Sequence, residues 1–277
     1  MGHRLTFVCS LALLLTVPGW SDDNKDLGSL TLEQLMDIRV EGAALHPQSL
    51  KDAPASVTIL TAEDIRKYGY RTLGEALGSV RGFYTGNNRT YHTVGVRGFN
   101  FPGDYASRVL VMVNGHNMAD NVLDFELFFG RDFPIEMNLI QRIEIIRGPS
   151  SALYGSNGVF ATVNIITKSP VEAGPPSLTT DIGSFGLKEG QVMAAGSLGK
   201  DVKVLFSGSL FNNSGESPLF FPEFNAPATN HGQAVRMNGE KGYHFFSNLV
   251  WRNWNVTAAF ADRKLIQPIS RGTDHLQ

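Results

Sequence analysis

The sequence contains a single cysteine, Cys9, among its 277 residues, which excludes a fold held together by disulfides. Neither sign of charge dominates, because 24 lysines and arginines stand against 26 aspartates and glutamates, so a basic nucleic-acid-binding surface is not expected. No run after residue 21 approaches the roughly 20 apolar residues of a membrane-spanning helix. With 42% hydrophobic residues the chain is too apolar for disorder. The composition therefore leaves two classes of protein, a globular protein or one that crosses a membrane with strands.

The first 21 residues have the features of a secretory signal peptide. Arg4 supplies a positive charge, and residues 5–17 form an apolar run that is too short to span a bilayer. Gly19 and Ser21 are the small residues expected before a cleavage site. Cys9 lies inside the apolar run rather than at its end, so lipidation is not expected. Export would therefore leave a mature chain without cysteine.

The region between this leader and about residue 170 has a mixed α/β pattern. Residues 55–60 predict a strand, and Thr61 with Asp64 three residues later predicts a capping box at the start of a helix. That helix ends at residues 68–69, and Thr72 begins a second short helix that runs through Leu77. Further strands are predicted at residues 109–113, 140–146 and 163–167.

A break rich in proline and glycine at residues 170–177 precedes a second pattern, in which apolar residues recur at every second position. The alternation is clearest at residues 202–210, 243–251 and 254–260, and weaker at 178–183 and 191–198. A long polar loop spans residues 212–241, whereas the other connections are short. Strands of about 10 residues with alternating short and long connections are typical of a transmembrane barrel. The strand pattern alone also permits a soluble β-sandwich.

Three segments, in this order, resemble the plug domain of TonB-dependent outer-membrane receptors. The first, at residues 54–77, reads PASVTILTAEDIRKYGYRTLGEAL. The second pairs VGVRGF at 94–99 with RVLVMVNGH at 108–116. The third and most specific, at residues 139–168, reads LIQRIEIIRGPSSALYGSNGVFATVNIITK. The resemblance covers about residues 30–168 by motif and the later strands by pattern only.

This resemblance implies an α+β plug domain followed by antiparallel strands of a transmembrane β-barrel. The implied divisions are a signal peptide, a periplasm-facing segment with a coupling motif, the plug domain, and about the first five barrel strands, at residues 1–21, 22–50, 51–169 and 178–277. A receptor barrel of this kind has about 22 strands. At ~10 residues per strand it needs about 220 residues before loops. We therefore expect an incomplete 22-strand barrel, the N-terminal part of a longer receptor, which by itself neither inserts nor transports.

The function implied by the resemblance is energy-coupled uptake of a bulky ligand at the cell outer membrane of a Gram-negative bacterium. A ferric siderophore, the commonest cargo of similar receptors, is the ligand that we expect, and cobalamin, haem and oligosaccharides are the alternatives. The implied partners are the inner-membrane energy-coupling protein TonB, an extracellular ligand such as an iron chelate, and outer-membrane lipid, with no nucleic acid. A ligand-binding or signalling module without transport is the alternative.

Members of the family carry a short extended motif near the mature N-terminus that adds as a strand to TonB. The segment that best resembles it here is Ile38, Arg39, Val40 and Glu41. Strand addition uses backbone hydrogen bonds, so the side-chain signature of such a motif is loose. An ordinary linker between leader and plug is the alternative for these residues.

Two arginines, Arg97 and Arg147, lie in the family motifs RGF and IRGP. The resemblance implies that they latch the plug to glutamates on the barrel wall, a role that suits the guanidinium fork because it pairs with both oxygens of a carboxylate. Glu144 is a candidate internal partner of either arginine. Two solvated surface arginines are the alternative interpretation.

Two plug loops, residues 83–91 and 100–105, combine aromatic, amide and turn residues, and such loops suit large amphipathic ligands. Loops shaped only for packing are the alternative. The candidate ligand-facing residues are Phe83, Tyr84, Asn87, Asn88, Tyr91, Phe101 and Tyr105.

No catalytic set is found in the sequence. Residues 148–152 fail the nucleophile-elbow pattern, because Ala152 stands at the place of its final glycine. The seven histidines show no metal-binding spacing, and no phosphate-binding loop is present. We therefore expect no enzyme activity, no catalytic residues, no metal site and no cofactor.

Overall fold

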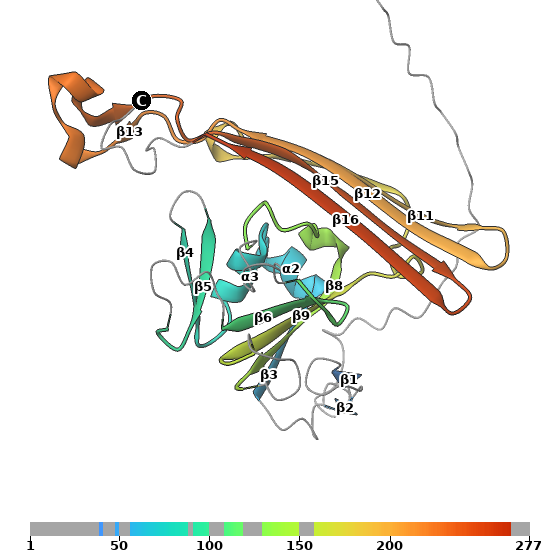
Figure 1. The fold of residues 1–277 in the computed structure, drawn as a ribbon. Coiled ribbons are helices and arrows are strands. Elements are labelled where there is room, and N and C mark those ends of the chain that lie inside the picture. Colours follow the sequence, from blue (N-terminus) through green and yellow to red (C-terminus); the bar gives the residue numbers. More distant parts are fainter. Residues whose placement is uncertain are drawn as a thin grey trace, which may run out of the picture.

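The computed structural model describes residues 39–40, 48–49, 56–87, 91–99, 108–118, 129–149 and 158–266. Two five-stranded sheets dominate the architecture, and they lie one above the other in Figure 1. The first belongs to the described part of residues 56–173, here called the α/β domain. The second is formed by residues 177–265, here called the meander sheet. The short strands β1 (Arg39–Val40) and β2 (Gln48–Ser49) pair antiparallel with each other.

The sheet of the α/β domain has the strand order β3-β8-β9-β6-β7. β6 and β9 are parallel and the other neighbours are antiparallel. A separate hairpin is made by β4 (Phe83–Asn87) and β5 (His92–Val96). The bounds of the sheet strands are β3 Ser56–Thr61, β6 Val109–Val113, β7 His116–Asn117, β8 Ile140–Arg147 and β9 Ala161–Thr167.

Two short helices, α2 (Ala62–Tyr68) and α3 (Leu73–Gly78), start where the sequence predicts. At α2 the Asp64 amide donates to Thr61 Oγ1 at 3.0 Å, and the Thr61 amide donates to Asp64 Oδ2 at 3.0 Å. Gly69 ends the helix with φ of 68°, a left-handed conformation in which glycine meets no steric cost. The predicted capping box is therefore confirmed.

Replacement of Thr61 by alanine is expected to lower the free energy of unfolding of the chain by about 1 kcal/mol, because the first turn of α2 loses its side-chain acceptor. Urea unfolding of the wild type and the variant, followed by circular dichroism, measures the difference. The matched control is Thr61→Ser, which keeps the hydroxyl. A serine variant that loses as much stability as the alanine variant would show that the cap is not the cause.

The core of the α/β domain lies between its sheet and its helices. Ile143 and Ile145 alternate along β8 as predicted and are fully buried, and so are Leu73 and Leu77 of α3. Every residue of β6 is buried, which is the pattern of a strand covered on both faces. The helices and the central strands therefore pack as one unit.

The meander sheet has the order β10-β11-β12-β15-β16, and its neighbours are all antiparallel. The prediction of about five strands in this part of the chain is confirmed. The connection from β12 to β15 carries a small hairpin of β13 (Leu219–Phe220) and β14 (Gln233–Ala234) at one end of the sheet (Figure 1). The strand bounds are β10 Ser177–Ile182, β11 Lys188–Leu198, β12 Val202–Asn213, β15 Glu240–Trp251 and β16 Trp254–Leu265.

The two faces of the meander sheet differ in polarity. The face toward the α/β domain buries polar side chains, among them Gln191, Ser209 and Asn248. The opposite face leaves large apolar side chains exposed, including Phe206, Leu210, Tyr243, Leu249 and Trp254. In a water-exposed sandwich an apolar face of this kind is covered by a second sheet. Among the described residues nothing covers it.

Across the described ranges of the chain, no helix is long and apolar enough to cross a bilayer.

Candidate functional site

Among the described residues, the contact between the α/β domain and the meander sheet is concentrated in residues 131–138, here called the bridging segment. Between described residues, every hydrogen bond and ion pair that joins the two parts starts in this segment. On the sheet side the partners come from four successive strands, β11, β12, β15 and β16. They are Glu189, Gln191, Ser209, Glu240, His244 and Arg263.

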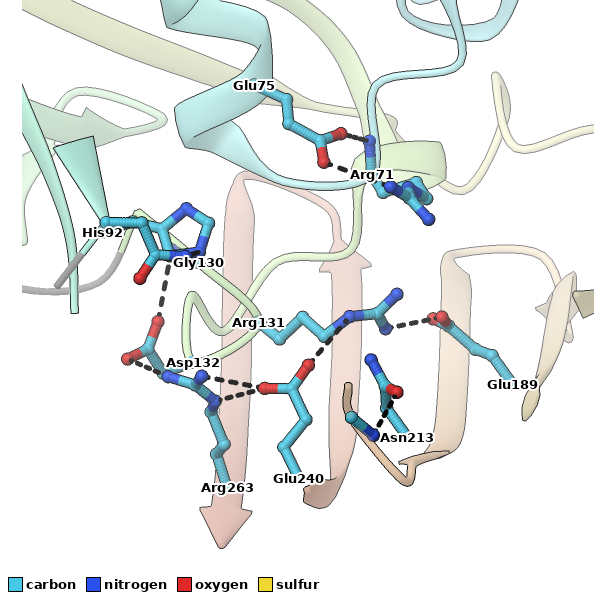
Figure 2. A network of polar contacts seen from close by, with 12 residues as sticks. Arg71, Glu75, His92, Gly130, Arg131, Asp132, Glu189, Asn213, Glu240 and Arg263 are labelled. Atoms are coloured by element: carbon cyan, nitrogen blue, oxygen red, sulfur yellow. Dashed lines mark hydrogen bonds and ion pairs between the residues drawn. The ribbon is translucent and has the colours of Figure 1, made fainter. Parts of the chain in front are cut away.

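Arg131 stands at the centre of this contact (Figure 2). Its Nη1 lies 2.6 Å from Glu189 Oε2, and its Nε lies 3.6 Å from Glu240 Oε1. The guanidinium carbon is 5.0 Å from the centre of the Phe211 ring, within the range of a cation–π contact. The side chains of Arg131 and both glutamates are only 12–14% exposed. The sheet therefore offers a closely fitting site for one guanidinium of the α/β domain.

Arg263 of β16 extends the same network (Figure 2). Its Nη2 lies 2.8 Å from Glu240 Oε2, and its Nη1 lies 3.4 Å from Asp132 Oδ2. Asp132 also accepts a hydrogen bond from the Gly130 amide at 3.2 Å. Acidic and basic groups thus alternate from Glu189 to Asp132, so each charge in the chain of contacts has an opposite charge beside it. Such an arrangement is what allows ionised groups to be held with little water around them.

A third contact joins Glu136 to Ser209 and His244. His244 Nδ1 lies 2.7 Å from Glu136 Oε1, and His244 Nε2 contacts the carbonyl oxygen of Arg131 at 2.8 Å. Ser209 Oγ donates to the same glutamate oxygen at 2.5 Å. In a hydrolytic triad the serine and the acid bind opposite nitrogens of the imidazole. Here both contact Nδ1, at 3.1 Å for the serine, so the arrangement holds the segment in place and cannot relay a proton in that manner.

Burial by itself would raise the pKa of Glu136, but the hydrogen bond and charge of His244, the Ser209 hydroxyl and Arg131 outweigh it and hold the pKa below the ordinary 4.5. Because the folded-state pKa is depressed, the carboxylate contributes stability above pH 4.5 that is lost as pH falls through the folded-state value. We expect Glu136→Gln to remove this part of the acid sensitivity. Urea unfolding of both proteins between about pH 3 and pH 6 measures it. If stability fell with pH equally in the wild type and the variant, Glu136 would not be the source of this acid sensitivity.

A cleft of about 910 Å³ lies beside the bridging segment, between the α/β domain and strands β10 and β11. Charged side chains of both signs contribute to its lining, with Arg66, Arg142 and Lys168 from the α/β domain and Asp181 and Glu189 from the meander sheet. Burial and the charge of Arg66 lower the pKa of Lys168. At the network, burial and the charge of Arg263 likewise lower the pKa of His92. In both cases a nearby positive charge and the partial loss of water disfavour the protonated form of the side chain.

The predicted coupling segment is only partly described. Arg39 and Val40 form β1 and pair with Ser49 and Gln48. Ile38 and Glu41 lie outside the described residues. The role of this segment in coupling stays a prediction.

The predicted latch residues are placed away from the described sheet contacts. The Arg147 guanidinium donates to the Arg81 carbonyl at 3.1 Å and to the hydroxyls of Ser56 and Thr58 at 2.9 Å, all inside the α/β domain. Arg97 lies in a tight turn with φ of 54°, and its amide donates to the Gly82 carbonyl. That either arginine latches the α/β domain to the barrel wall stays a prediction. The residue that contacts the meander sheet in the structure is Arg131, to which no sequence pattern pointed.

The suggested pairing of Glu144 with Arg97 or Arg147 needs a correction. Glu144 is fully buried and lies 2.9 Å from the Nη2 of Arg142, with Asn164 Nδ2 at 3.4 Å from its other oxygen. Residues two apart on a strand project from the same face, which brings Arg142 closer to Glu144 than the residues proposed. Glu144 therefore makes its contacts inside the sheet of the α/β domain, with Arg142 and Asn164.

The candidate ligand-facing residues divide into three groups. Phe83 is only 8% exposed and belongs to the core, which corrects its assignment, because alternation along β4 turns it inward and turns Tyr84 outward. Asn87 contacts His92 at 2.9 Å, and Tyr91 is half-buried, so both lie near the tip of the β4–β5 hairpin. Three further candidates lie outside the described residues: Asn88, Phe101 and Tyr105.

Comparison with known proteins gives a consistent result. The family model "TonB-dependent Receptor Plug Domain" matches residues 49–162. The chain is 32% identical over 139 residues to the iron-regulated outer membrane virulence protein of Vibrio cholerae, covering 48% of the chain and 20% of that protein. It is 35% identical over 154 residues to the ferric enterobactin receptor PirA of Pseudomonas aeruginosa, covering 53% and 20%. It is 29% identical over 161 residues to the vitamin B12 transporter BtuB of Vibrio vulnificus, covering 56% and 25%.

Solved structures show the same fold. The ferripyoverdine receptor FpvA of Pseudomonas aeruginosa aligns with a TM-score of 0.60 at 14% identity, over 85% of this chain and 29% of that one. The ferric yersiniabactin uptake receptor FyuA of Yersinia pestis aligns with a TM-score of 0.54 at 17% identity, over 76% and 31%. The chain spans only a fifth to a quarter of the length of the curated relatives it matches.

Proposed function

The chain carries the plug domain and barrel strands of a TonB-dependent outer-membrane receptor, and on this premise we propose that it serves the energy-coupled uptake of a ferric siderophore across the outer membrane. In this proposal the α/β domain is the plug and the meander sheet is part of the barrel wall. The ligand binds from outside, the plug shifts, and TonB drives release to the periplasm.

The polarity of the meander sheet is the observation that carries this proposal. Its exposed apolar face suits contact with lipid, and its buried polar face suits an aqueous lumen. The α/β domain is bound to the polar face through the bridging segment. A wide lumen that contains a folded domain is closed until that domain moves, which is the behaviour required of a gated importer.

The nature of the ligand is proposed from the relatives. The names of two of them refer to iron or to ferric enterobactin, and a third is a vitamin B12 transporter. A ferric siderophore is therefore the first candidate, and cobalamin is the second. Tyr84 and Tyr91 on the β4–β5 hairpin are the described residues that we propose face the ligand.

The test expresses the reading frame that contains codons 1–277, with any codons that follow, in iron-limited Gram-negative cells that lack their own siderophore receptors. Uptake of radioiron-labelled ferric enterobactin is expected to exceed that of vector-only cells at least tenfold and to vanish in cells without TonB. Labelled cobalamin is the parallel probe. Binding of either probe without TonB-dependent uptake would favour the binding or signalling alternative.

The coupling segment can be tested in the same cells. Val40→Pro removes a backbone donor from β1 and is expected to abolish uptake if this segment adds as a strand to TonB. Val40→Ala keeps the backbone donor and serves as the matched control. Equal uptake by the two variants would show that coupling uses another segment.

A further inference from the structure

The contact between His244 and the bridging segment places an acceptor at each nitrogen of the imidazole. Nδ1 lies 2.7 Å from Glu136 Oε1, and Nε2 lies 2.8 Å from the carbonyl oxygen of Arg131. A neutral imidazole has one donor and one acceptor nitrogen, whereas the imidazolium cation has two donors. Both contacts are therefore satisfied only when the pair of His244 and Glu136 holds one additional proton.

The immediate surroundings place that proton on the imidazole. Ser209 Oγ donates to the same oxygen of Glu136, and a hydrogen bond of this kind favours the ionised carboxylate. The ring of Phe211 stacks on the imidazole with 5.6 Å between the ring centres, and the face of an aromatic ring attracts a cation. The side chain of His244 is only 6% exposed, so water cannot readily replace either contact.

The charged groups around this contact form a network in which carboxylates outnumber arginines. In the described part of the chain its members are the carboxylates Asp132, Glu136, Glu189 and Glu240 and the guanidinium groups of Arg131 and Arg263. Arg71 also lines the small cavity beside His244, but it pairs with Glu75 at 3.5 Å. Both arginines of the network are bound to the other three carboxylates, so the imidazolium is the cation that pairs with Glu136.

From this geometry we infer that the attachment of the bridging segment to the meander sheet is linked to one proton, and that it weakens as the pH rises. Below about pH 6.5, the ordinary pKa of a histidine, the imidazole is protonated both in the contact and apart from it. Above that pH the separated imidazole is neutral, so forming the contact requires the uptake of a proton. The equilibrium then shifts toward detachment by up to about tenfold for each pH unit.

The position of His244 along its strand exposes the contact to the medium outside the cell. His244 lies near the start of β15, which follows the long connection at residues 214–239. In outer-membrane barrels the long connections are extracellular and the short turns are periplasmic. The assignment to external pH rests on the proposed function. The regulation itself goes beyond that function, because it acts on the plug whatever ligand is carried.

Hydrogen exchange of the bridging segment, measured by mass spectrometry on the receptor expressed from the full reading frame, tests the inference. The wild type is compared with His244→Gln, which has no titrating group at this position. Both proteins give identical peptides for residues 131–138, so the ratio of their exchange rates at each pH removes the intrinsic pH dependence of exchange. Between about pH 6 and pH 9 we expect the protection of the wild type, relative to the variant, to fall at least tenfold.

Two further variants complete the design. Glu136→Gln decides the question if the His244 variant does not assemble, because a neutral amide needs no cation beside it. Its protection, corrected for intrinsic exchange, is expected to change less than twofold over the same pH range. The matched control is His231→Gln, which replaces an exposed histidine in the connection between β13 and β14 and should keep the wild-type profile.

A wild-type profile that stays constant relative to His244→Gln would overturn the inference, and so would a tenfold fall that persists in Glu136→Gln. A constant profile in His231→Gln would assign the proton to the connection and overturn it as well. Hydrogen exchange needs no ligand. Absence of uptake in the cells described above would therefore count against the proposed function and leave this result unaffected.

Discussion

Replacement of Glu144 by alanine is expected to destabilise the α/β domain by about 3–5 kcal/mol, because it leaves one partner of a buried ion pair without its counter-charge. Glu144 is fully buried in the middle of β8, and the side chain of Arg142 is 16% exposed. Asn164 would also lose the acceptor of its amide. Hydrogen exchange of the β8 and β9 amides measures the effect as a loss of protection.

The control for this prediction is Glu144→Gln, which keeps an acceptor near Asn164 and removes the charge. It is expected to lose less stability than the alanine variant. The double variant of Glu144→Ala with Arg142→Ala should lose less than the sum of the two single variants, because residues in one network are not independent. A loss below about 1 kcal/mol for Glu144→Ala would show that the pair contributes little in this site.

Local features of the fold could be predicted from the sequence. The capping box of Thr61 and Asp64 and the stop at Gly69 depend on residues three to five apart along the chain. The strands of the meander sheet follow from alternation at every second residue, which needs no knowledge of neighbours in space. The ends of these strands are predicted less accurately than their centres. β12 and β16 run to Asn213 and Leu265, beyond the apolar alternation. The end of β16 carries Arg263, which pairs with Asp132 of the α/β domain.

The contact between the two parts could not be predicted in the same way. Arg131 meets Glu189 across 58 residues of sequence, and Asp132 meets Arg263 across 131. No local pattern connects such positions. A weak signal existed, since Glu240, His244 and Arg263 place charged or polar groups at sheet positions that face away from the apolar side. Alternation shows that two faces differ, but it does not show what each face meets.

Replacement of Arg131 by methionine is expected to weaken the contact between the α/β domain and the meander sheet by about 3 kcal/mol, the lower end for breaking a buried pair, because the side chains keep some exposure. Glu240 would keep Arg263 as a partner, whereas Glu189 would lose the arginine that lies 2.6 Å away. Urea unfolding of the chain in detergent micelles measures the loss. Arg131→Lys keeps the charge but lacks the planar guanidinium, so its free energy of unfolding should lie between those of the wild type and the methionine variant.

A double-mutant cycle with Glu189→Gln separates the pair from its surroundings. If Arg131 and Glu189 act on each other directly, the double variant should recover about 1–3 kcal/mol relative to the sum of the single losses. The same cycle with Gln191→Ala serves as the control, because Gln191 contacts Asn138 and Ser207 rather than Arg131. A coupling energy below about 0.5 kcal/mol for Arg131 and Glu189 would mean that the guanidinium is held mainly by Phe211 and Glu240. The attachment of Arg131 would then depend on Phe211 of β12 and Glu240 of β15, while Asn138 and Gln191 would still join the bridging segment to β11.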